Sequence, residues 1–520
     1  MAKRLMIWFF IFCLVTGSYG QITPAAIEHI INSPSQFSRI PLSYPEETRE
    51  FYKCQLYSPV WTDDRALITD LFQLLEQSPD LGLQEKDYQH DFIRGYRAGN
   101  FYLASLYDSV EAELKFTDAA IHFLHDILYG NRIPSIGYNG LNYSPACFDI
   151  SSVLQLAIGK RQLAYLHLII EPRTPEYAAI KEKIALYNRM LSDTSFREVK
   201  ITSSKVSSAN KPLLNKLYRL GFLDRADQPV PDSLLKIKVK EAQRLFNLLP
   251  DGVLRSTFLE ALNEPLTARL EELCYALNTL RWLSCIKETG KIIVVNIPSA
   301  TLLVYDEDKA VLESRIIVGK RSTPTPLLCS RVNEVILYPY WMVPHSIATK
   351  ELLPSIKRNV GYLDANSYQV INRQGRVVDP YSIDWSTLSR SYFPYIIRQS
   401  TGCDNALGLI KLNFYNPYSV YLHDTPTKPL FAMNKRYFSH GCMRVEKAIE
   451  LGRYILKDNA VAIDTLTEKG CLYNQSPVTV PAIEKLPVFV LYNTAWIDSA
   501  GRVSFSEDVY RKNRELFQRN

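Results

Sequence analysis

The hydrophobic pattern of this chain changes at Gly290, and the change limits the folds that the chain can adopt. Upstream, over residues 21–200, apolar residues recur mainly at helical spacing. Downstream, short runs rich in Val and Ile predict strands at residues 292–297, 301–305 and 311–318. With 520 residues the chain is too long for one ordinary domain, and about three or four are expected. We therefore predict a multidomain α+β protein, helical first and mostly β afterwards.

Helix-start signals divide the helical half. Thr62-Asp63-Asp64 precedes an apolar-periodic run through Leu75, and Thr117-Asp118 precedes another that ends near Gly130. A third helix is predicted at residues 175–190. His122 and His125 stand three residues apart in the second run, but no third ligand stands at a matching spacing, so a metal site is not expected.

Residues 205–263 read as a small module that alternates helix, turn and helix. Gly221 can end the first helix, and Asp251-Gly252 is a strong turn signal. One longer helix then follows at residues 266–283. The residue pattern by itself predicts a generic three-helix bundle.

The N-terminus has the pattern of an export signal. Lys3 and Arg4 are followed by an apolar segment at residues 5–15 that is too short to span a bilayer, and Ser18 and Gly20 have the spacing of a cleavage site. We expect a signal peptide at residues 1–20, cut after Gly20, with an uncleaved anchor as the alternative. No later stretch reaches the roughly 20 apolar residues of a transmembrane helix.

Residues 421–445 concentrate the groups that nucleophilic catalysis needs. Cys442 directly follows Ser439-His440-Gly441. A thiol is mostly protonated at neutral pH, so it needs a base, and the base needs a group that orients it. His440 leaves an extended segment on the same face as Cys442, whereas His423 must come from a neighbouring strand. The local spacing favours His440, and a buried cysteine with two core histidines is the non-catalytic alternative.

His423, then fifteen residues, then Ser-His-Gly-Cys-Met-Arg at 439–444 resembles the active site of the L,D-transpeptidases. The resemblance implies that Cys442 is the nucleophile and that His423 is the base, with its other ring nitrogen held by the backbone carbonyl of Asp424. His440 shapes the surroundings of the thiolate, and the backbone N–H groups of Gly441 and Cys442 bind the oxyanion. We expect substrate contacts from Arg444, Ser439, Tyr421, Asn405, Tyr338 and Trp341.

The same resemblance extends to the domain plan of the long periplasmic members of this family. It implies a helical scaffold domain at 21–204, a peptidoglycan-binding-like module at 205–263 and a return helix of the scaffold at 264–288. A mostly-β catalytic domain follows at 289–475, with a capping subdomain inserted at 345–400. A C-terminal segment at 476–520 packs on the catalytic domain. The module resembles a peptidoglycan-binding domain through Ala242, Gln243, Phe246 and the Asp251-Gly252 turn. A lid fits the chemistry, because excluding water protects an acyl-enzyme from hydrolysis.

The implied function is that of an exported, periplasmic cysteine acyltransferase that forms 3–3 cross-links between peptidoglycan stem peptides and releases D-Ala. An L,D-carboxypeptidase or endopeptidase that hydrolyses the same thioester is one alternative, and a peptidoglycan-binding structural protein is another. The expected partners are donor and acceptor stem peptides and carbapenem inhibitors, with no cofactor, metal, nucleic acid or integral membrane segment and with a monomeric chain. The net charge of +6 is compatible with an anionic wall polymer.

Cysteine usage adds one departure from the family. Loss of the signal removes Cys13 and leaves eight cysteines, and a free Cys442 leaves seven, which cannot all pair. Where the family has Pro-Gly-Pro, this chain has Thr401-Gly402-Cys403. Cys403 could therefore be structural, disulfide-bonded or redox-sensitive, and it could compete with Cys442 as a second nucleophile.

Overall fold

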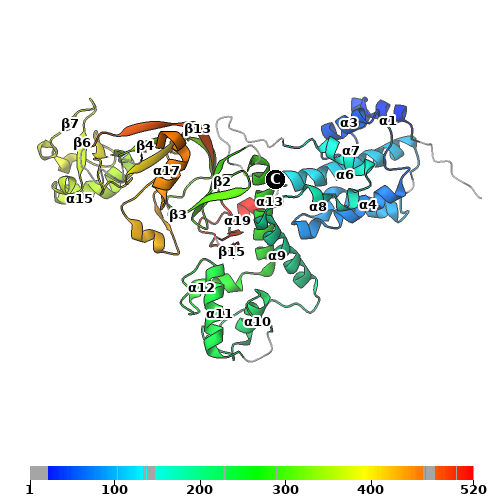
Figure 1. Cartoon of the computed structure of the whole chain (residues 1–520), viewed down its shortest axis with the longest axis horizontal. Helices are drawn as coiled ribbons and strands as arrows, with labels where there is room; N and C mark the ends of the chain where they lie inside the picture. The colour runs from blue at the N-terminus through cyan, green and yellow to red at the C-terminus, as the bar shows by residue number, and fades with distance from the viewer. Residues whose placement is uncertain are drawn as a thin grey trace, which may run out of the picture. The chain divides into compact units, whose positions relative to one another are not determined.

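The structure is a computed structural model that describes residues 22–101, 103–132, 136, 147–225, 230–287, 290–460, 463, 475–498 and 501–518. The chain forms two compact units (Figure 1). The helical unit comprises Met1–Asn131 and Phe148–Glu171, and the C-terminal unit comprises Arg132–Cys147 and Pro172–Asn520. The predicted signal peptide at residues 1–20 lies outside the described residues. No helix within the described ranges is long and apolar enough to cross a membrane.

The helical unit is built around α6, Leu106–Leu128, against which several other helices pack (Figure 1). These are α1 (Pro24–Ile31), α2 (Pro34–Phe37), α3 (Pro45–Cys54), α4 (Arg65–Leu75), α5 (His90–Arg97), α7 (Ile150–Gly159) and α8 (Leu166–Ile170), with 3₁₀ turns at Ser78–Leu81, Glu85–Tyr88 and Leu163–Tyr165. The helix predicted after Thr62-Asp63-Asp64 is confirmed as α4, whose N-terminus Asp64 caps by accepting the N–H of Leu67.

The predicted start of α6 at Thr117-Asp118 is wrong, because the helix begins after Ser105. Ser105 and Asp108 form a reciprocal capping box there. Thr117 and Asp118 lie in the helix interior, where they serve tertiary contacts instead. The Asp118 carboxylate accepts the N–H groups of Ser43 and Tyr44 at 3.0 and 2.7 Å. A Thr-Asp pair that looks like a cap in the sequence is therefore a bridge between segments far apart in the chain.

A buried carboxylate on α6, which we call the Glu113 cluster, holds the loop before α4. Glu113 is fully buried. Its carboxylate accepts hydrogen bonds from Tyr52 Oη at 3.0 Å, from the N–H of Trp61 at 3.0 Å, and from the N–H and hydroxyl of Thr62, each at 2.9 Å, and also from the N–H of Val60. Both carboxylate oxygens are thus satisfied by protein donors, as a buried charge requires.

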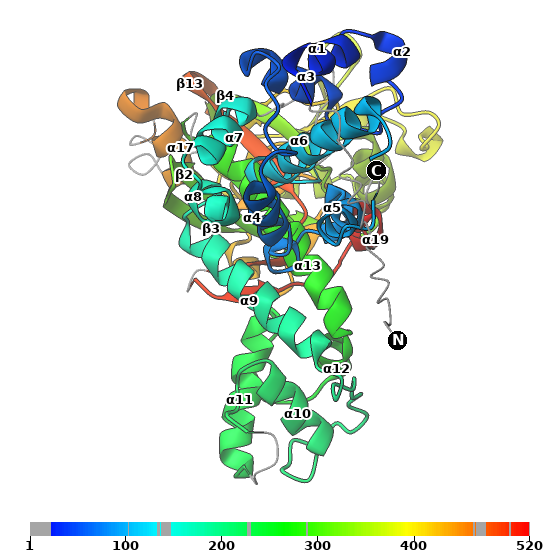
Figure 2. The same ribbon diagram turned by 90° about the vertical axis from the view of Figure 1, so that its right-hand side faces the viewer.

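The C-terminal unit begins with five helices. These are α9 (Pro175–Ser192), α10 (Lys211–Arg219), α11 (Asp232–Leu245), α12 (Ser256–Asn263) and α13 (Leu266–Lys287). The long helices α9 and α13 pack side by side (Figures 1 and 2). Both belong to the C-terminal unit.

The helix–turn–helix prediction for residues 205–263 is confirmed by α10, α11 and α12. Gly252 has a φ of +77°, which favours glycine in this turn. The buried side chain of Gln243 holds the turn, because its amide donates to Asp251 at 2.9 Å and its carbonyl accepts the N–H of Gly252 at 2.8 Å. Local turn chemistry and the packing of α11 therefore support each other.

Among the described residues the β-rich half forms a nine-stranded sheet in the order β11-β3-β12-β10-β9-β4-β13-β1-β2, and β2 also pairs with β3, so that the sheet closes on itself. The strands are β1 (Ile292–Asn296), β2 (Thr301–Asp306), β3 (Lys309–Gly319), β4 (Leu328–Leu337), β9 (Ile410–Phe414), β10 (Leu422–His423), β11 (Tyr437–Ser439), β12 (Met443–Val445) and β13 (Val478–Leu491). The three strands predicted after Gly290 are confirmed as β1, β2 and β3. Helix α17, Ala448–Leu456, packs on β13 and β9.

Strand β13 falls within residues 476–520, the segment expected to pack on the catalytic domain. This strand lies inside the sheet, where it pairs with β4 on one side and with β1 on the other. Its residues Leu486, Val488 and Val490 are fully buried in the core of the sheet. Beyond it lie the hairpin of β14 (Ala495–Ile497) and β15 (Val503–Phe505) and the short helix α19 (Asn513–Phe517).

The inserted subdomain, residues 341–399, has a sheet and a core of its own. Its strands β5 (Trp341–Met342), β6 (Tyr368–Ile371), β7 (Val377–Val378) and β8 (Ile396–Gln399) pair in the order β5-β8-β6-β7. Its helical segments are α14 (His345–Ile347), a π-helical turn (Ala348–Leu352), α15 (Leu353–Arg358) and α16 (Tyr362–Ala365). An insertion at 345–400 was predicted, and pairing of β5 with β8 moves its start to Trp341.

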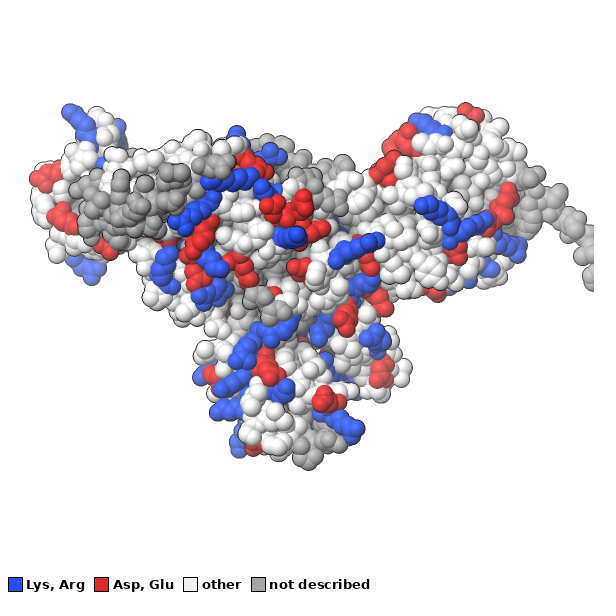
Figure 3. Space-filling view, viewed as in Figure 1, with Lys and Arg blue, Asp and Glu red and all other residues white. Residues whose placement is uncertain are grey.

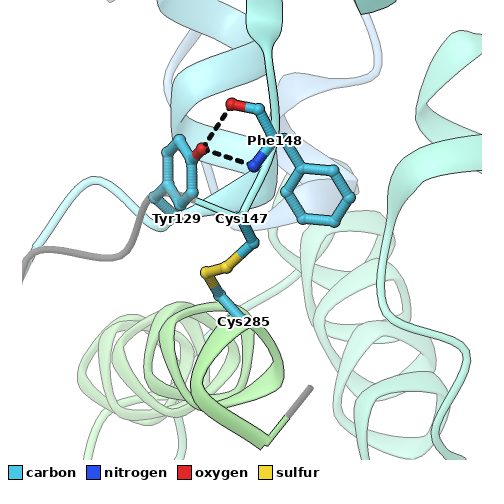
Figure 4. The surroundings of a disulfide bond; sticks show 4 residues. All are labelled: Tyr129, Cys147, Phe148 and Cys285. Carbon is cyan, nitrogen blue, oxygen red and sulfur yellow. Dashed lines mark hydrogen bonds between the residues drawn. A yellow bond between two sulfur atoms is a disulfide. The ribbon is translucent and has the colours of Figure 1, made fainter. Parts of the chain in front are cut away.

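One disulfide ties Cys147 to Cys285 on α13, with the two Cα atoms 5.9 Å apart (Figure 4). The side chain of Asn278, also on α13, binds the backbone of Arg132 through both its oxygen and its nitrogen. In the helical unit, the next residue, Phe148, is bound through its backbone N–H and carbonyl to the hydroxyl of Tyr129 (Figure 4). Cys54, Cys274 and Cys442 are free thiols.

Candidate active site

Three adjacent strands bring the predicted catalytic residues onto one face of the sheet. In the parallel pair β10–β12, Leu422 lies opposite Met443 and His423 lies opposite Arg444. In the antiparallel pair β9–β10, His423 lies opposite Lys411. Because side chains alternate across a strand, Leu422 and Met443 enter the core while His423 and its two cationic neighbours share the other face. Cys442 and Tyr421 stand two residues before Arg444 and His423 and extend that face.

His423 is buried and is held in one tautomer. Its Nδ1 lies 2.5 Å from the carbonyl oxygen of Asp424, and since a carbonyl can only accept, Nδ1 carries the hydrogen. The lone pair is therefore on Nε2. Burial, followed by the charge of Arg444, lowers the pKa of His423 to about 3, against the hydrogen bond to Asp424. The imidazole is neutral at pH 7, which is the form that a general base needs.

The Asp424 carboxylate fixes the loop that precedes β9. It accepts the N–H of Leu409 at 3.0 Å and pairs with Lys428. Gly408 has a φ of +62°, and a Cβ at this position would come within 2.3 Å of the same carboxylate. The backbone of Gly408 and Leu409 can therefore approach Asp424 only because residue 408 is glycine.

Cys442 is half-buried and has acceptor and donor groups on different sides. Its Sγ lies 4.0 Å from the carbonyl oxygen of Ser419, which can only accept from a thiol. Tyr421 also acts on the sulfur, first through its backbone N–H and then through its side chain, and both lower the pKa of the thiol. Burial raises the pKa of the Cys442 thiol, while Tyr421, Lys411 and Arg444 act in the opposite direction. The resting group is accordingly a thiol beside a neutral imidazole.

Side-chain hydroxyls hold the loop from Ser439 to Cys442. Ser439 Oγ is buried, donates to the carbonyl of Cys442 at 2.5 Å and accepts the N–H of Gly441 at 3.1 Å. Thr325 Oγ1 donates to the carbonyl of Gly441 at 2.8 Å. Gly441 itself has a φ of +119°. In the described part of the chain the N–H of Cys442 has no acceptor, whereas the N–H of Gly441 is already bound.

His440 lies apart from His423 and faces the inserted subdomain. It is exposed, and its Nε2 lies 2.6 Å from Oε1 of Glu351 on the π-helical turn. Lys320 Nζ lies 3.4 Å from the same nitrogen. Although local spacing favoured His440 as the base, this geometry commits its ring nitrogen to a carboxylate on another segment.

The other predicted substrate contacts have different surroundings. Asn405 is buried, with its amide bound to the carbonyls of Pro339 and Ser400 and its oxygen bound to the N–H of Leu407, so it holds a loop in place. Tyr338 is buried, with its N–H bound to Leu409 and a φ of +48°. Trp341 is half-buried and hydrogen-bonds the side chain of Tyr421. Of these three, Trp341 makes a contact within the cysteine site.

Cys403 takes part in a disulfide bond, so it is not the competing nucleophile that the sequence left open. The adjacent Thr401 is buried, with its hydroxyl 3.1 Å from the carbonyl oxygen of Gln475. The loop that lacks Pro-Gly-Pro is therefore constrained by other means. Within the described ranges no group of three His, Cys, Asp or Glu residues could hold a metal ion.

Four residues of the site were missed by the sequence analysis. Lys411 and Ser419 carry groups close to the sulfur, while Thr325 and Glu351 hold the loop and the second histidine. Lys411 had the clearest signal, since an isolated lysine stands in an otherwise apolar run, Leu407–Leu412. The others depend on chain pairings that no local pattern shows.

Comparison with known proteins agrees with this geometry. Residues 290–463 match the L,D-transpeptidase catalytic domain, and residues 46–184 match the Scaffold domain. A Haemophilus influenzae protein named "Putative L,D-transpeptidase" is 39% identical over 225 residues, which cover 43% of this chain and 45% of that protein. The chain thus matches less than half the length of this curated relative.

Solved structures of the same enzyme class are more distant. The crystal structure of an L,D-transpeptidase from Stackebrandtia nassauensis is 12% identical, with 57% of this chain and 98% of that chain covered and a TM-score of 0.21. An L,D-transpeptidase in complex with imipenem is 14% identical, with 39% and 59% covered and a TM-score of 0.18. The chain thus contains an L,D-transpeptidase catalytic domain, with a Scaffold domain before it.

Proposed function

We propose that this chain is an exported peptidoglycan L,D-transpeptidase that forms 3–3 cross-links through an acyl-enzyme on Cys442. One observation carries the proposal. A neutral, buried His423, with its free lone pair on Nε2, shares a sheet face with a half-buried Cys442 thiol. A thiol and a base held in this way are the minimum that thioester chemistry requires.

Acylation begins at the thiol. As the sulfur bonds to the carbonyl carbon after the third residue of a donor stem, the thiol proton moves to Nε2 of His423. The tetrahedral intermediate then breaks its C–N bond. D-Ala leaves as an amine after taking the proton from the imidazolium, and a thioester remains on Cys442. The Nδ1 hydrogen bond to Asp424 keeps the ring oriented through both transfers.

Cross-linking reverses the roles of base and acid. The side-chain amine of the third residue of an acceptor stem attacks the thioester, and His423 takes its proton. The C–S bond breaks, and the sulfur regains a proton from the imidazolium. The N–H of Cys442 is the available oxyanion donor, while that of Gly441 joins only if it releases Ser439 Oγ.

The inserted subdomain provides the means to favour an amine over water. Glu351 of this subdomain binds His440, which is two residues from the nucleophile. We propose that this contact keeps the subdomain over the acyl-enzyme, where exclusion of water slows hydrolysis. A hydrolase would instead need water to reach the acyl-enzyme.

The test is incubation of the purified chain with a disaccharide tetrapeptide, followed by product masses. A cross-linked dimer with release of D-Ala is expected. A tripeptide without dimer would instead identify a hydrolase, and no product would leave wall binding as the function.

We propose that the segment containing α10–α12 binds peptidoglycan. Lys and Arg outnumber Asp and Glu in residues 205–263, and Figure 3 shows them on this lobe. Lys236 and Lys240 lie about one turn apart on α11, and the same helix carries the exposed side chains of Leu234 and Ile237. Deletion of residues 205–263 should weaken sedimentation with purified peptidoglycan and spare alkylation of Cys442. Undiminished pelleting would make the segment a spacer.

A strained β-lactam should acylate the same sulfur, because opening the ring makes thiolate attack favourable. We propose one stable carbapenem adduct per chain, on the peptide that contains Cys442.

Action on the wall also implies a place in the cell envelope.

A further inference from the structure

His423 lies between two cations. Lys411 on β9 and Arg444 on β12 are its register partners on either side, and all three side chains share one face. A cation on each side opposes a positive charge on the imidazole. A stable thiolate–imidazolium pair therefore has no support here, and the negative charge that develops on Cys442 during attack needs another counter-charge.

Lys411 is placed to supply that charge. Its Nζ lies 4.2 Å from the centroid of the Tyr421 ring, and the side chain of the same tyrosine lowers the pKa of the Cys442 thiol. The ring thus fixes the ammonium group next to the side chain that acts on the sulfur.

The charge of Glu334 on β4 acts on Lys411, but the two form no ion pair within the described ranges. Glu334 accepts the side-chain amide of Asn413 at 2.8 Å, and Asp424 pairs with Lys428. Within the described ranges, Lys411 itself has no carboxylate at ion-pair distance. Besides Lys411, the groups that act on Cys442 are the backbone N–H and side chain of Tyr421, the Arg444 guanidinium and the Ser419 carbonyl, and burial keeps the tyrosine protonated by raising its pKa.

We propose that Lys411 is a positioning residue that, held by the ring of Tyr421, provides the counter-charge for the Cys442 thiolate so that His423 acts as a neutral base. The inference rests on the proposed function and adds a residue to it. Lys411 keeps its own proton throughout: the thiol proton goes to Nε2 of His423 as the S–C bond forms. Arg444 contributes from the other side of His423.

Alkylation of Cys442 by iodoacetamide tests this, because the reagent is uncharged and needs no stem peptide. A Cys54→Ser background removes the exposed competing thiol, and peptide mapping assigns the product. The midpoint of the alkylation rate against pH should be the same in the parent chain and in Lys411→Arg. In Lys411→Met the midpoint should rise by about one pH unit, which lowers the rate at pH 7.5 about tenfold. Lys435→Met, an ion-paired surface lysine of the same unit, is the control and should change nothing.

His423→Ala separates this inference from an imidazolium counter-ion. It should leave the midpoint nearly unchanged, because it removes no charge. A shift with His423→Ala as large as that with Lys411→Met, or no shift with Lys411→Met, would overturn the inference. A Cys442 that resists alkylation at every pH would overturn the proposed function as well.

A measurement on the unmodified chain covers the case in which Lys411→Met does not fold. Nitrogen NMR of the His423 ring should show the neutral Nδ1–H form from pH 5 to pH 9. A ring that is protonated at low pH and loses that proton together with the thiol would refute the proposal.

Discussion

The Glu113 cluster and the Cys442 site are both buried polar centres, and they differ in what is left unbound. In the helical unit, the carboxylate oxygens of Glu113 accept protein donors from three backbone positions and two hydroxyls. In the C-terminal unit, Nε2 of His423 and the N–H of Cys442 have no protein partner within the described ranges. The first arrangement leaves nothing for a ligand, and the second leaves an acceptor and a donor beside a nucleophile.

This difference separates a polar group that stabilises a fold from one that can react. A buried polar atom without a hydrogen-bond partner lowers the stability of the fold. Such atoms are therefore expected at functional sites, where activity requires them. Substitutions of Glu113 should therefore mainly change the stability of the fold, whereas substitutions at the Cys442 site should mainly change reactivity.

Cys442→Ala should give the largest effect, a complete loss of cross-linking and of the carbapenem adduct, since no other group can form the thioester. The free energy of unfolding should stay within about 1 kcal/mol of the parent, because a half-buried thiol is only a weak hydrogen-bond donor. Mass spectrometry of products and of the intact chain measures both. An adduct that still forms on the alanine variant would remove Cys442 from its role.

His423→Ala should lower the turnover by about 10²- to 10⁴-fold, which is the usual contribution of a general base. His440→Gln should lower it less than about tenfold, because an amide still hydrogen-bonds Glu351. Steady-state rates of D-Ala release compare the two. A larger loss in His440→Gln would assign the base to the histidine nearer in sequence.

Acid should weaken the C-terminal unit through His423. The ring has a pKa of about 3 when folded and about 6.5 when exposed, so the unfolded chain binds a proton that the folded chain lacks between these values. Stability therefore falls as the pH drops through this window, by on the order of 4 kcal/mol at its acid end. Urea unfolding of the parent and of His423→Gln should show a steeper loss in the parent. Parallel curves would contradict the neutral ring.

Glu113→Gln should destabilise the helical unit by about 2–3 kcal/mol, because the amide N–H₂ of glutamine would face backbone donors. The iodoacetamide profile of Cys442 should not change. Thermal unfolding and alkylation on one preparation would test both statements, and a stability equal to that of the parent would mean that the cluster tolerates an unbound donor.

Local patterns in the sequence predicted the elements better than their pairings. Strands β1 to β3 and helices α10 to α12 have boundaries set by turns such as Asp251-Gly252, and these were found. The start of α6 was missed because Thr117 and Asp118 bind segments far away in the sequence. The place of β13 was missed because a short apolar run does not say which strands flank it.

The site shows the same division. The stretch at 421–445 contains Cys442, His423 and the loop that orients them, so the motif was visible. Lys411 and Glu351 come from segments that only the sheet register and the inserted subdomain bring close. Asn405, expected at the substrate, has all its polar atoms bound to the backbone, which no spacing could reveal.

The excursion of the chain between Arg132 and Cys147 has a practical consequence for anyone who wants to express the parts separately. The chain enters the C-terminal unit at Arg132, leaves it after Cys147 and returns at Pro172. Both ends of the excursion are attached to α13, through Asn278 and Cys285. A clone that starts at residue 172 would lose this segment and leave Cys285 without its partner. A protease that removes the helical unit would have to cut three times, near residues 131, 147 and 171, and the stretch between the first two cuts would stay cross-linked to the remainder.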